Sequence, residues 1–287
     1  MMKARRIVRV PLKLMYITNN EQIASVAENC GVDRIFIDME YIGKEERQFG
    51  MDTVKSRHTV EDVSKLRDVI KKSELLVRVN PIHSSTYGHT DSYDEINRVI
   101  DAGADILMLP MYRTVDEVEK FLRIVDGRAK TMLLTETIDA CNIMDDVLKI
   151  FEVDEIHIGL NDLHLEMCKK FMFELLADGT VDAVCQKINR AGKPYGFGGI
   201  ARIGYGLLPA EYVIAEHYRI GSTGAILSRS FCNADKFSFV EEIRDLFMRE
   251  VDKIRETEQK VSNFSSIDFE ENRVNVKNIV DRIVWKM

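Results

Sequence analysis

Leu133-Leu134-Thr135-Glu136-Thr137 and Ile158-Gly159-Leu160-Asn161-Asp162-Leu163 are the two stretches that decide the fold. In each, a short apolar run leads into an acidic residue, and such runs are typical of buried parallel strands. Residues 138–151 between them have apolar side chains at helical spacing, so the order is strand, helix, strand. Because parallel strands of a barrel end at one face, we expect Glu136 and Asp162 to lie close together there.

The same alternation of strand and helix continues along most of the chain. Eight short apolar runs, each followed by a segment of helical periodicity, predict a (β/α)8 TIM barrel rather than an open sheet. A dinucleotide-binding glycine fingerprint does not follow an early strand, which disfavours the Rossmann alternative. The predicted strands are residues 12–17, 34–38, 75–79, 106–110, 130–134, 155–158, 195–200 and 223–227.

The C-terminal part of the chain is expected to extend beyond the barrel. We predict a catalytic barrel domain over residues 1–257, followed over 258–287 by a polar linker and a C-terminal helix. Residues 258–273 are mostly polar, which suggests the linker, whereas 274–285 show apolar residues at helical spacing. A second polar segment, residues 43–57, follows the second strand and is interpreted as an active-site loop.

Composition narrows the class of protein. The 287 residues suit one eight-stranded barrel, and 45% hydrophobic with 30% charged residues is an ordinary globular balance. The formal net charge of −7 disfavours nucleic-acid binding, and no apolar run approaches membrane-spanning length. The five cysteines are scattered without CxxC spacing, which favours free thiols in a reducing compartment. We therefore expect a cytoplasmic protein that binds neither nucleic acid nor membranes.

The two strand-end carboxylates predict a metal site. Two neighbouring carboxylates repel each other unless a positive charge lies between them, and a divalent cation meets that need. Mg²⁺ or Mn²⁺ prefers oxygen ligands, often takes only two protein carboxylates and keeps open positions for water or substrate. We expect Glu136 and Asp162 to be the ligands. A 2-oxo acid could then bind the cation through its carboxylate and ketone oxygens.

Further charged residues are predicted at the same barrel face. Asp38, Glu40 and Tyr41 follow the second strand, and Arg78 ends the apolar run of the third. An arginine in such a run cannot remain buried without acidic partners nearby. Its charge-assisted hydrogen bonds would stabilise an enolate, the intermediate needed to make or break a bond next to a ketone.

An ordered set of motifs resembles the HpcH/HpaI aldolase and citrate lyase β-subunit family over residues 14–231. The resemblance implies a modified (β/α)8 barrel whose last helix packs on a neighbouring subunit, and hence a homo-oligomer. It also implies cleavage or formation of carbon–carbon bonds through a pyruvate- or acyl-type enolate, with Mg²⁺ or another divalent metal. The motifs are Ile37-Asp38-Met39-Glu40, Val77-Arg78-Val79, Gly103-Ala104-Asp105-Ile106-Leu107-Met108-Leu109-Pro110-Met111, Glu136-Thr137 and Ile158-Gly159-Leu160-Asn161-Asp162-Leu163.

The resemblance also implies roles for individual residues. Glu136 and Asp162 match the metal ligands, and Arg78 matches the arginine that binds the oxo acid and steadies the enolate. Asp38 and Glu40 match the acidic residues that order water and the catalytic base.

One position departs from the family pattern. In the aldolase branch a histidine serves as base after the strand-two acid, but this chain has Tyr41 there. A tyrosine, with an ordinary pKa of about 10, is a poor base at neutral pH. His58, His83 and His89 lie in loops at the same face and are alternative bases. The departure also favours the acyl-CoA lyase branch, which uses acidic residues here.

Taken together, the sequence predicts a divalent-metal-dependent carbon–carbon lyase of the class II aldolase type. It would act on a 2-oxo acid or related carboxylate through a metal-bound enolate, with Arg78, Gly159 and Asn161 contacting the substrate. Tyr41 is included with Arg78, Asp38 and Glu40 as a catalytic candidate. Two alternatives stay open: a citrate-lyase-like acyl-CoA lyase or thioesterase, and a barrel that binds an oxo acid without catalysis.

Overall fold

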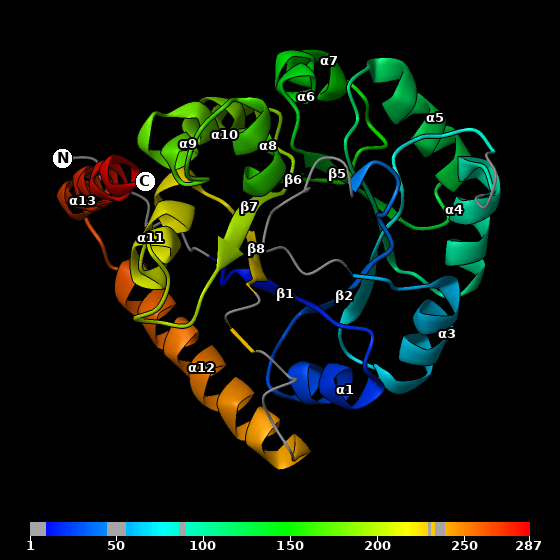
Figure 1. Ribbon diagram of the computed structural model, residues 1–287, viewed down its shortest axis with the longest axis horizontal. Helices are drawn as coiled ribbons and strands as arrows, with labels where there is room; N and C mark the ends of the chain where they lie inside the picture. The colour runs from blue at the N-terminus through cyan, green and yellow to red at the C-terminus, as the bar shows by residue number, and fades with distance from the viewer. Residues whose placement is uncertain (1–9, 45–55, 86–89, 229–230, 233–238) are drawn as a thin grey trace, which may run out of the picture.

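Eight parallel strands close into a barrel, and each strand pairs with its neighbours in chain order. In this computed structural model, residues 10–44, 56–85, 90–228, 231–232 and 239–287 are described. Figure 1 shows the strands at the centre with helices around them, so the predicted TIM barrel is confirmed. The strands are β1 Lys13–Ile17, β2 Arg34–Asp38, β3 Glu74–Arg78, β4 Ile106–Leu109, β5 Lys130–Thr135, β6 Glu155–Ile158, β7 Tyr195–Ile200 and β8 Gly224–Leu227.

The surrounding helices begin where the sequence supplies polar caps. The side chains of Asn20, Thr59 and Thr114 each accept a hydrogen bond from a first-turn N–H, which replaces a missing intrahelical partner. The helices are α1 Glu21–Asn29, α3 Val60–Val69, α4 Ser92–Asp101, α5 Val115–Val125, α6 Ile138–Asn142, α7 Met144–Val147, α8 Leu160–Glu166, α9 Glu174–Ala177, α10 Thr180–Arg190, α11 Ala210–Ile220, α12 Val240–Val261 and α13 Ser266–Lys286. None of the helices in the described ranges is long and apolar enough to cross a bilayer.

Two apolar regions hold the barrel together. The larger lies between the strands and the helices, and a smaller one fills the barrel interior. The interior cluster consists of large side chains such as Phe36, Met108 and Met132, so the barrel is a packed core and not a pore. Chemistry is therefore confined to the ends of the barrel.

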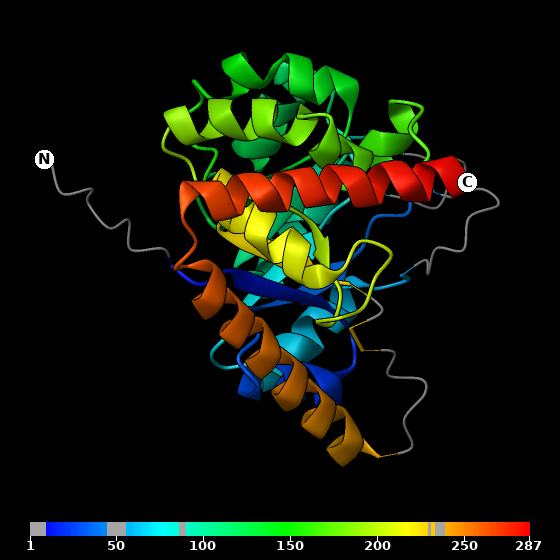
Figure 2. The same cartoon turned by 90° about the vertical axis from the view of Figure 1, so that its left-hand side faces the viewer.

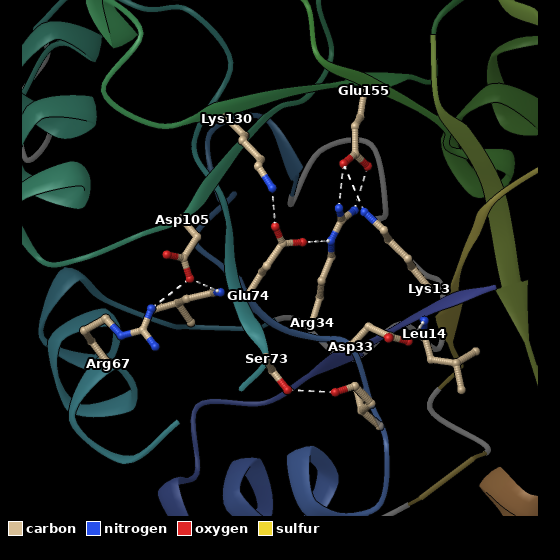
Figure 3. Close-up of polar contacts among 12 residues, drawn as sticks. Lys13, Leu14, Asp33, Arg34, Arg67, Ser73, Glu74, Asp105, Lys130 and Glu155 are labelled. Carbon is tan, nitrogen blue, oxygen red and sulfur yellow. Dashed lines mark hydrogen bonds and ion pairs between the residues drawn. The ribbon is translucent and has the colours of Figure 1, made fainter. Parts of the chain in front are cut away.

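An ionic cluster occupies the amino-terminal end of the barrel (Figure 3). Arg34 is 1% exposed and donates to both carboxylate oxygens of Glu155, at 2.7 and 2.6 Å, and to Glu74 at 2.9 Å. Lys130 donates to the same Glu74. Burial would raise the pKa of Glu155, but the Arg34 hydrogen bonds and charge outweigh it and hold the pKa below its ordinary value. This end is therefore closed by paired charges.

The predicted linker at residues 258–273 is wrong, because most of this segment is helical. The helix α12 continues to Val261, and α13 begins at Ser266 after a capping box formed by Ser265 and Asp268. The polar composition misled the prediction, since several polar side chains are buried at helix contacts. Glu258, for example, is 3% exposed and accepts hydrogen bonds from the Leu12 N–H and the Tyr218 hydroxyl.

The C-terminal helix docks on the barrel, as its apolar spacing predicts. In Figure 2, α13 lies across α11, and it also packs against α9. Phe269, Val276 and Val280 are buried in this contact, and Asn272 donates to the Glu216 carboxylate at 2.8 Å. The helix starts eight residues earlier than the predicted 274–285, because its first turns use polar residues on their solvent side.

Candidate active site

The carboxyl-terminal ends of β2 and β3 bring Asp38 and Arg78 together. The strand register sets the two residues side by side, and Arg78 donates from Nε and Nη2 to the two Asp38 oxygens, both at 2.8 Å. Such a bidentate pair fixes the plane of the guanidinium. Burial would raise the pKa of Asp38, but the Arg78 and Lys44 charges hold it far below its usual range. Asp38 is thus a permanently charged anchor.

Lys44 belongs to this cluster, and the sequence reasoning missed it. Its Nζ lies 2.7 Å from an Asp38 oxygen and 3.7 Å from Glu40 Oε2, while Arg78 Nη1 lies 3.2 Å from the same Glu40 oxygen. Each carboxylate therefore contacts both cations. The sequence did contain a pointer to Lys44. Asp38 and Glu40 are two acids with only one arginine as partner, so a second basic side chain is expected nearby, and Lys44 is the first lysine after them.

Glu136 is positioned by two backbone features. The Met111 N–H donates to Glu136 Oε1 at 3.2 Å, and Met111 has φ of 53°, a left-handed conformation that is costly for a residue with a side chain. On the other side, a Cβ at position 159 would lie only 2.7 Å from Glu136 Oε2. A glycine is therefore needed at position 159 to leave room for the carboxylate, which is 2% exposed.

Asp162 lies in the first turn of α8, which starts directly after β6. Gly159 is the N-cap residue of this helix, so Asp162 is the third helical residue and follows the glycine that contacts Glu136. The structure therefore places both predicted metal ligands at the same end of the barrel, just after the neighbouring strands β5 and β6. Asn161 is exposed at this rim.

The backbone N–H and carbonyl of Gly159 already make hydrogen bonds within the protein, which leaves them little capacity to bind a substrate. Its N–H donates to the Thr135 carbonyl at 3.0 Å, and its carbonyl accepts from the Leu163 N–H at 3.2 Å. Substrate contact by Gly159 and Asn161 stays a prediction, and for Gly159 the structure shows a spacing role next to Glu136.

Tyr41 and the loop histidines offer no evident base. Burial and the charge of Glu95 raise the pKa of Tyr41, whose backbone N–H is held by Asn80 Oδ1. His58 Nδ1 accepts the Asp38 N–H at 3.0 Å, and burial lowers the pKa of His58, so its Nε2 carries the proton. His83 lies between the Pro81 and Thr90 carbonyls. His89 lies outside the described residues.

Comparison with known proteins identifies the family. The HpcH/HpaI aldolase/citrate lyase family model matches residues 13–200. Among curated proteins, none matches this sequence. An HpcH/HpaI aldolase/citrate lyase family protein from Burkholderia cenocepacia J2315 has 15% identity and a TM-score of 0.62, over 83% of this chain and 96% of its own. The HpcH/HpaI aldolase from Desulfitobacterium hafniense DCB-2 has 15% identity and a TM-score of 0.58, over 86% of this chain and 93% of its own.

A third similar structure is that of the citrate synthase SbnG, with 15% identity and a TM-score of 0.56, over 87% of this chain and 94% of its own. At these identities the structural likeness establishes the shared fold, and the family model establishes the kinship. The family model, together with the ordered strand-end residues, shows that this chain belongs to the HpcH/HpaI aldolase/citrate lyase family, which supports a lyase-type enzymatic function.

Proposed function

We propose that this protein is a divalent-metal-dependent carbon–carbon lyase of the aldolase type that acts on a small 2-oxo acid through an enolate. One observation carries the proposal: an arginine fixed by two carboxylates lies within electrostatic reach of Glu136 at the barrel mouth. Burial would lower the pKa of Arg78, but Asp38, Glu40 and, more weakly, Glu136 keep it well above its ordinary value. Arg78 thus remains positive where an anionic intermediate would form.

The residues at the mouth fit a hard divalent cation. Four carboxylates lie at this end of the barrel with two basic side chains, and the excess of acidic groups favours a cation there. The gap at Gly159 keeps space beside Glu136 Oε2. Two protein carboxylates are the expected number of ligands, since Mg²⁺ is usually bound through one or two carboxylates and keeps several waters. The four carboxylates at this end are Asp38, Glu40, Glu136 and Asp162.

Glu136 and Asp162 would hold Mg²⁺ or Mn²⁺, which supplies Lewis-acid polarisation of the oxo acid when bound. Arg78 has five N–H donors, and within the described chain three of them face Asp38 and Glu40. One donor on each terminal nitrogen is left to bind the oxo-acid carboxylate and to stabilise negative charge on the enolate oxygen.

The proton-transfer roles follow from the charges. Asp38 is held too strongly as a carboxylate to accept a proton at neutral pH, so it acts by orienting Arg78. We assign to Glu40, together with water, the acceptance of the substrate proton. Tyr41 keeps its own proton at neutral pH, because burial raises its pKa, and can act only as a donor.

Tyr41 also supports a second candidate, a citrate-lyase-like acyl-CoA lyase or thioesterase. The aldolase branch has a histidine base at the position of Tyr41, and neither Tyr41 nor His58 replaces it at neutral pH, which leaves the hydroxyl proton to Glu40 and water. Turnover only with thioester substrates would favour this candidate. A homo-oligomeric state and a cytoplasmic location are further proposals that follow from the family resemblance and the cysteine pattern.

The proposal is tested by Mn²⁺ titration together with a retro-aldol assay on 4-hydroxy-2-oxo acids. Since loss of an outer-shell partner already costs about 10- to 100-fold in metal affinity, Glu136→Gln and Asp162→Asn should each cost at least about 100-fold. Glu119→Gln, an exposed carboxylate on α5, is the matched control and should leave both affinity and turnover unchanged. Full metal affinity and turnover in both site variants would overturn the proposal.

A further inference from the structure

Arg202 lies at the mouth of the barrel, at the same end as the proposed catalytic residues. It is two residues beyond the end of β7, and the Ser228 N–H donates to the Ile200 carbonyl, so the connections that follow β7 and β8 start side by side. The Arg202 charge also reaches the β8 side: burial raises the pKa of the Cys232 thiol, and Arg202 opposes that rise. Arg202 therefore lies just beyond β7 and within electrostatic reach of Cys232, which follows β8.

The Arg202 side chain makes no hydrogen bond and no ion pair with any part of the chain that the structure describes. Its Nε is buried without an acceptor. Other arginines removed from solvent are paired with carboxylates: Arg34 with Glu155 and Arg78 with Asp38. Leaving a buried charged donor unsatisfied costs free energy, so this guanidinium is prepared for an acceptor that the described part of the chain does not supply.

Tyr205 holds the guanidinium in place. The Arg202 Cζ lies 4.3 Å from the centre of the Tyr205 ring, and the Tyr205 N–H donates to the Arg202 carbonyl at 2.9 Å, which closes a tight turn. Stacking on a ring face fixes the plane of a guanidinium but leaves its N–H edges available. Tyr205 is 53% exposed, so the pair borders solvent at the rim.

We propose that Arg202 binds an anionic group, a carboxylate or a phosphate, at the far end of the carbonyl compound that is released by or condensed with the oxo-acid enolate. The proposal rests on the proposed function and adds a specificity residue to it. The planar fork of arginine matches both anions, and barrels commonly bind phosphate beside the connections after strands seven and eight. Arg78 would thus bind the oxo-acid half of the substrate and Arg202 the tail of the other half.

The first test measures kcat/KM in the condensation direction with pyruvate and matched pairs of aldehydes. The pairs are glyceraldehyde 3-phosphate with glyceraldehyde, and 4-oxobutanoate with butanal. Arg202→Gln should lower the ratio of anionic to neutral kcat/KM by about 10- to 100-fold, mainly through KM, because a charge-assisted contact is lost. Arg202→Lys should recover part of it. The pair with the larger change identifies phosphate or carboxylate as the ligand.

Arg123→Gln is the matched control, since it removes an equally charged but exposed side chain from α5 and should leave the ratio unchanged. An unchanged ratio in folded Arg202→Gln would overturn the assignment.

A second test does not depend on turnover. Phenylglyoxal modification of the wild-type protein, followed by peptide mass spectrometry, should slow at Arg202 when inorganic phosphate or succinate is added, and not at Arg123. Equal modification of Arg202 with and without both anions would overturn the proposal. If the wild-type protein condenses none of the aldehydes while Arg202 is protected, the aldolase function fails and the anion site stands.

Discussion

Replacing Gly159 by alanine tests how the candidate metal ligand is positioned. The added Cβ would lie 2.7 Å from Glu136 Oε2, 2.8 Å from Glu136 Cβ and 3.3 Å from Leu134 Cδ1. Carbon atoms ordinarily pack at about 3.5–4.0 Å, so the two Cβ atoms must separate by about 1 Å. The carboxylate end could swing away, but Glu136 Cβ is tied to the backbone of β5 and cannot move alone.

We expect two effects of different size. Overpacking should destabilise the protein by about 1–3 kcal/mol. A catalytic group displaced by about 1 Å should reduce turnover by about 100-fold, because the reacting groups no longer align. The Met111 N–H contact to Glu136 should lengthen at the same time.

Three measurements separate these effects: thermal unfolding, Mn²⁺ affinity and kcat/KM. Gly224→Ala is the control, because its added Cβ would meet Lys13 O and Met15 Cε at an ordinary 3.6 Å. It should leave Mn²⁺ affinity and turnover within about twofold of the wild type, since surroundings at ordinary contact distance need no shift. If Gly159→Ala also kept normal metal affinity and turnover, the reasoning that Glu136 needs this gap would be refuted.

Three further substitutions test the rest of the structure. Lys44→Met should destabilise the protein by about 3–5 kcal/mol in urea at pH 7, since it leaves buried carboxylates short of a cation; wild-type stability would contradict this. Arg34→Met should cost a similar amount at pH 7. Arg34 helps to hold the pKa of Glu155 below the ordinary 4.5. The stabilisation by this ion pair is therefore complete above pH 4.5 and is lost as the pH falls through the lowered pKa of Glu155. An equal loss of stability in Arg34→Met at pH 7 and at pH 3 would contradict this expectation. Asn272→Ala should lower stability by about 1–3 kcal/mol, read by thermal unfolding, because the buried Glu216 Oε1 loses the Asn272 donor while Arg219 still binds Oε2. An unchanged melting temperature would count against this docking contact.

The strands could be predicted from sequence because of where they lie. Strands covered on both faces must be apolar in their middle, so the apolar stretches within 34–38 and 130–134 stand out against the polar turns. Their order then fixes which residues share the mouth. In the structure Asp38, Arg78 and Glu136 do lie at that end, while their catalytic and metal-binding roles stay predictions.

Other features depend on contacts between distant residues and leave no local pattern. The Met111 amide that supports Glu136 comes from the connection after β4, and its positive φ is unexpected for methionine. Nothing in residues 258–273 showed that Glu258 and Asn272 are buried against α11 and the segment just before β1, which is why a linker was predicted. Pairwise burial of polar groups is a tertiary property, and composition alone cannot reveal it.

The central claim, enolate formation at a two-carboxylate metal site, is tested most directly by hydrogen–deuterium exchange at the methyl group of pyruvate. The protein is incubated in heavy water with Mg²⁺, with Mn²⁺ or with a chelator, and the methyl signal is followed by proton NMR. We expect metal-dependent exchange in the wild type and in Glu119→Gln, and none in Glu136→Gln. Exchange that persists in folded Glu136→Gln, or a wild-type protein that shows no exchange with either metal, would contradict the claim.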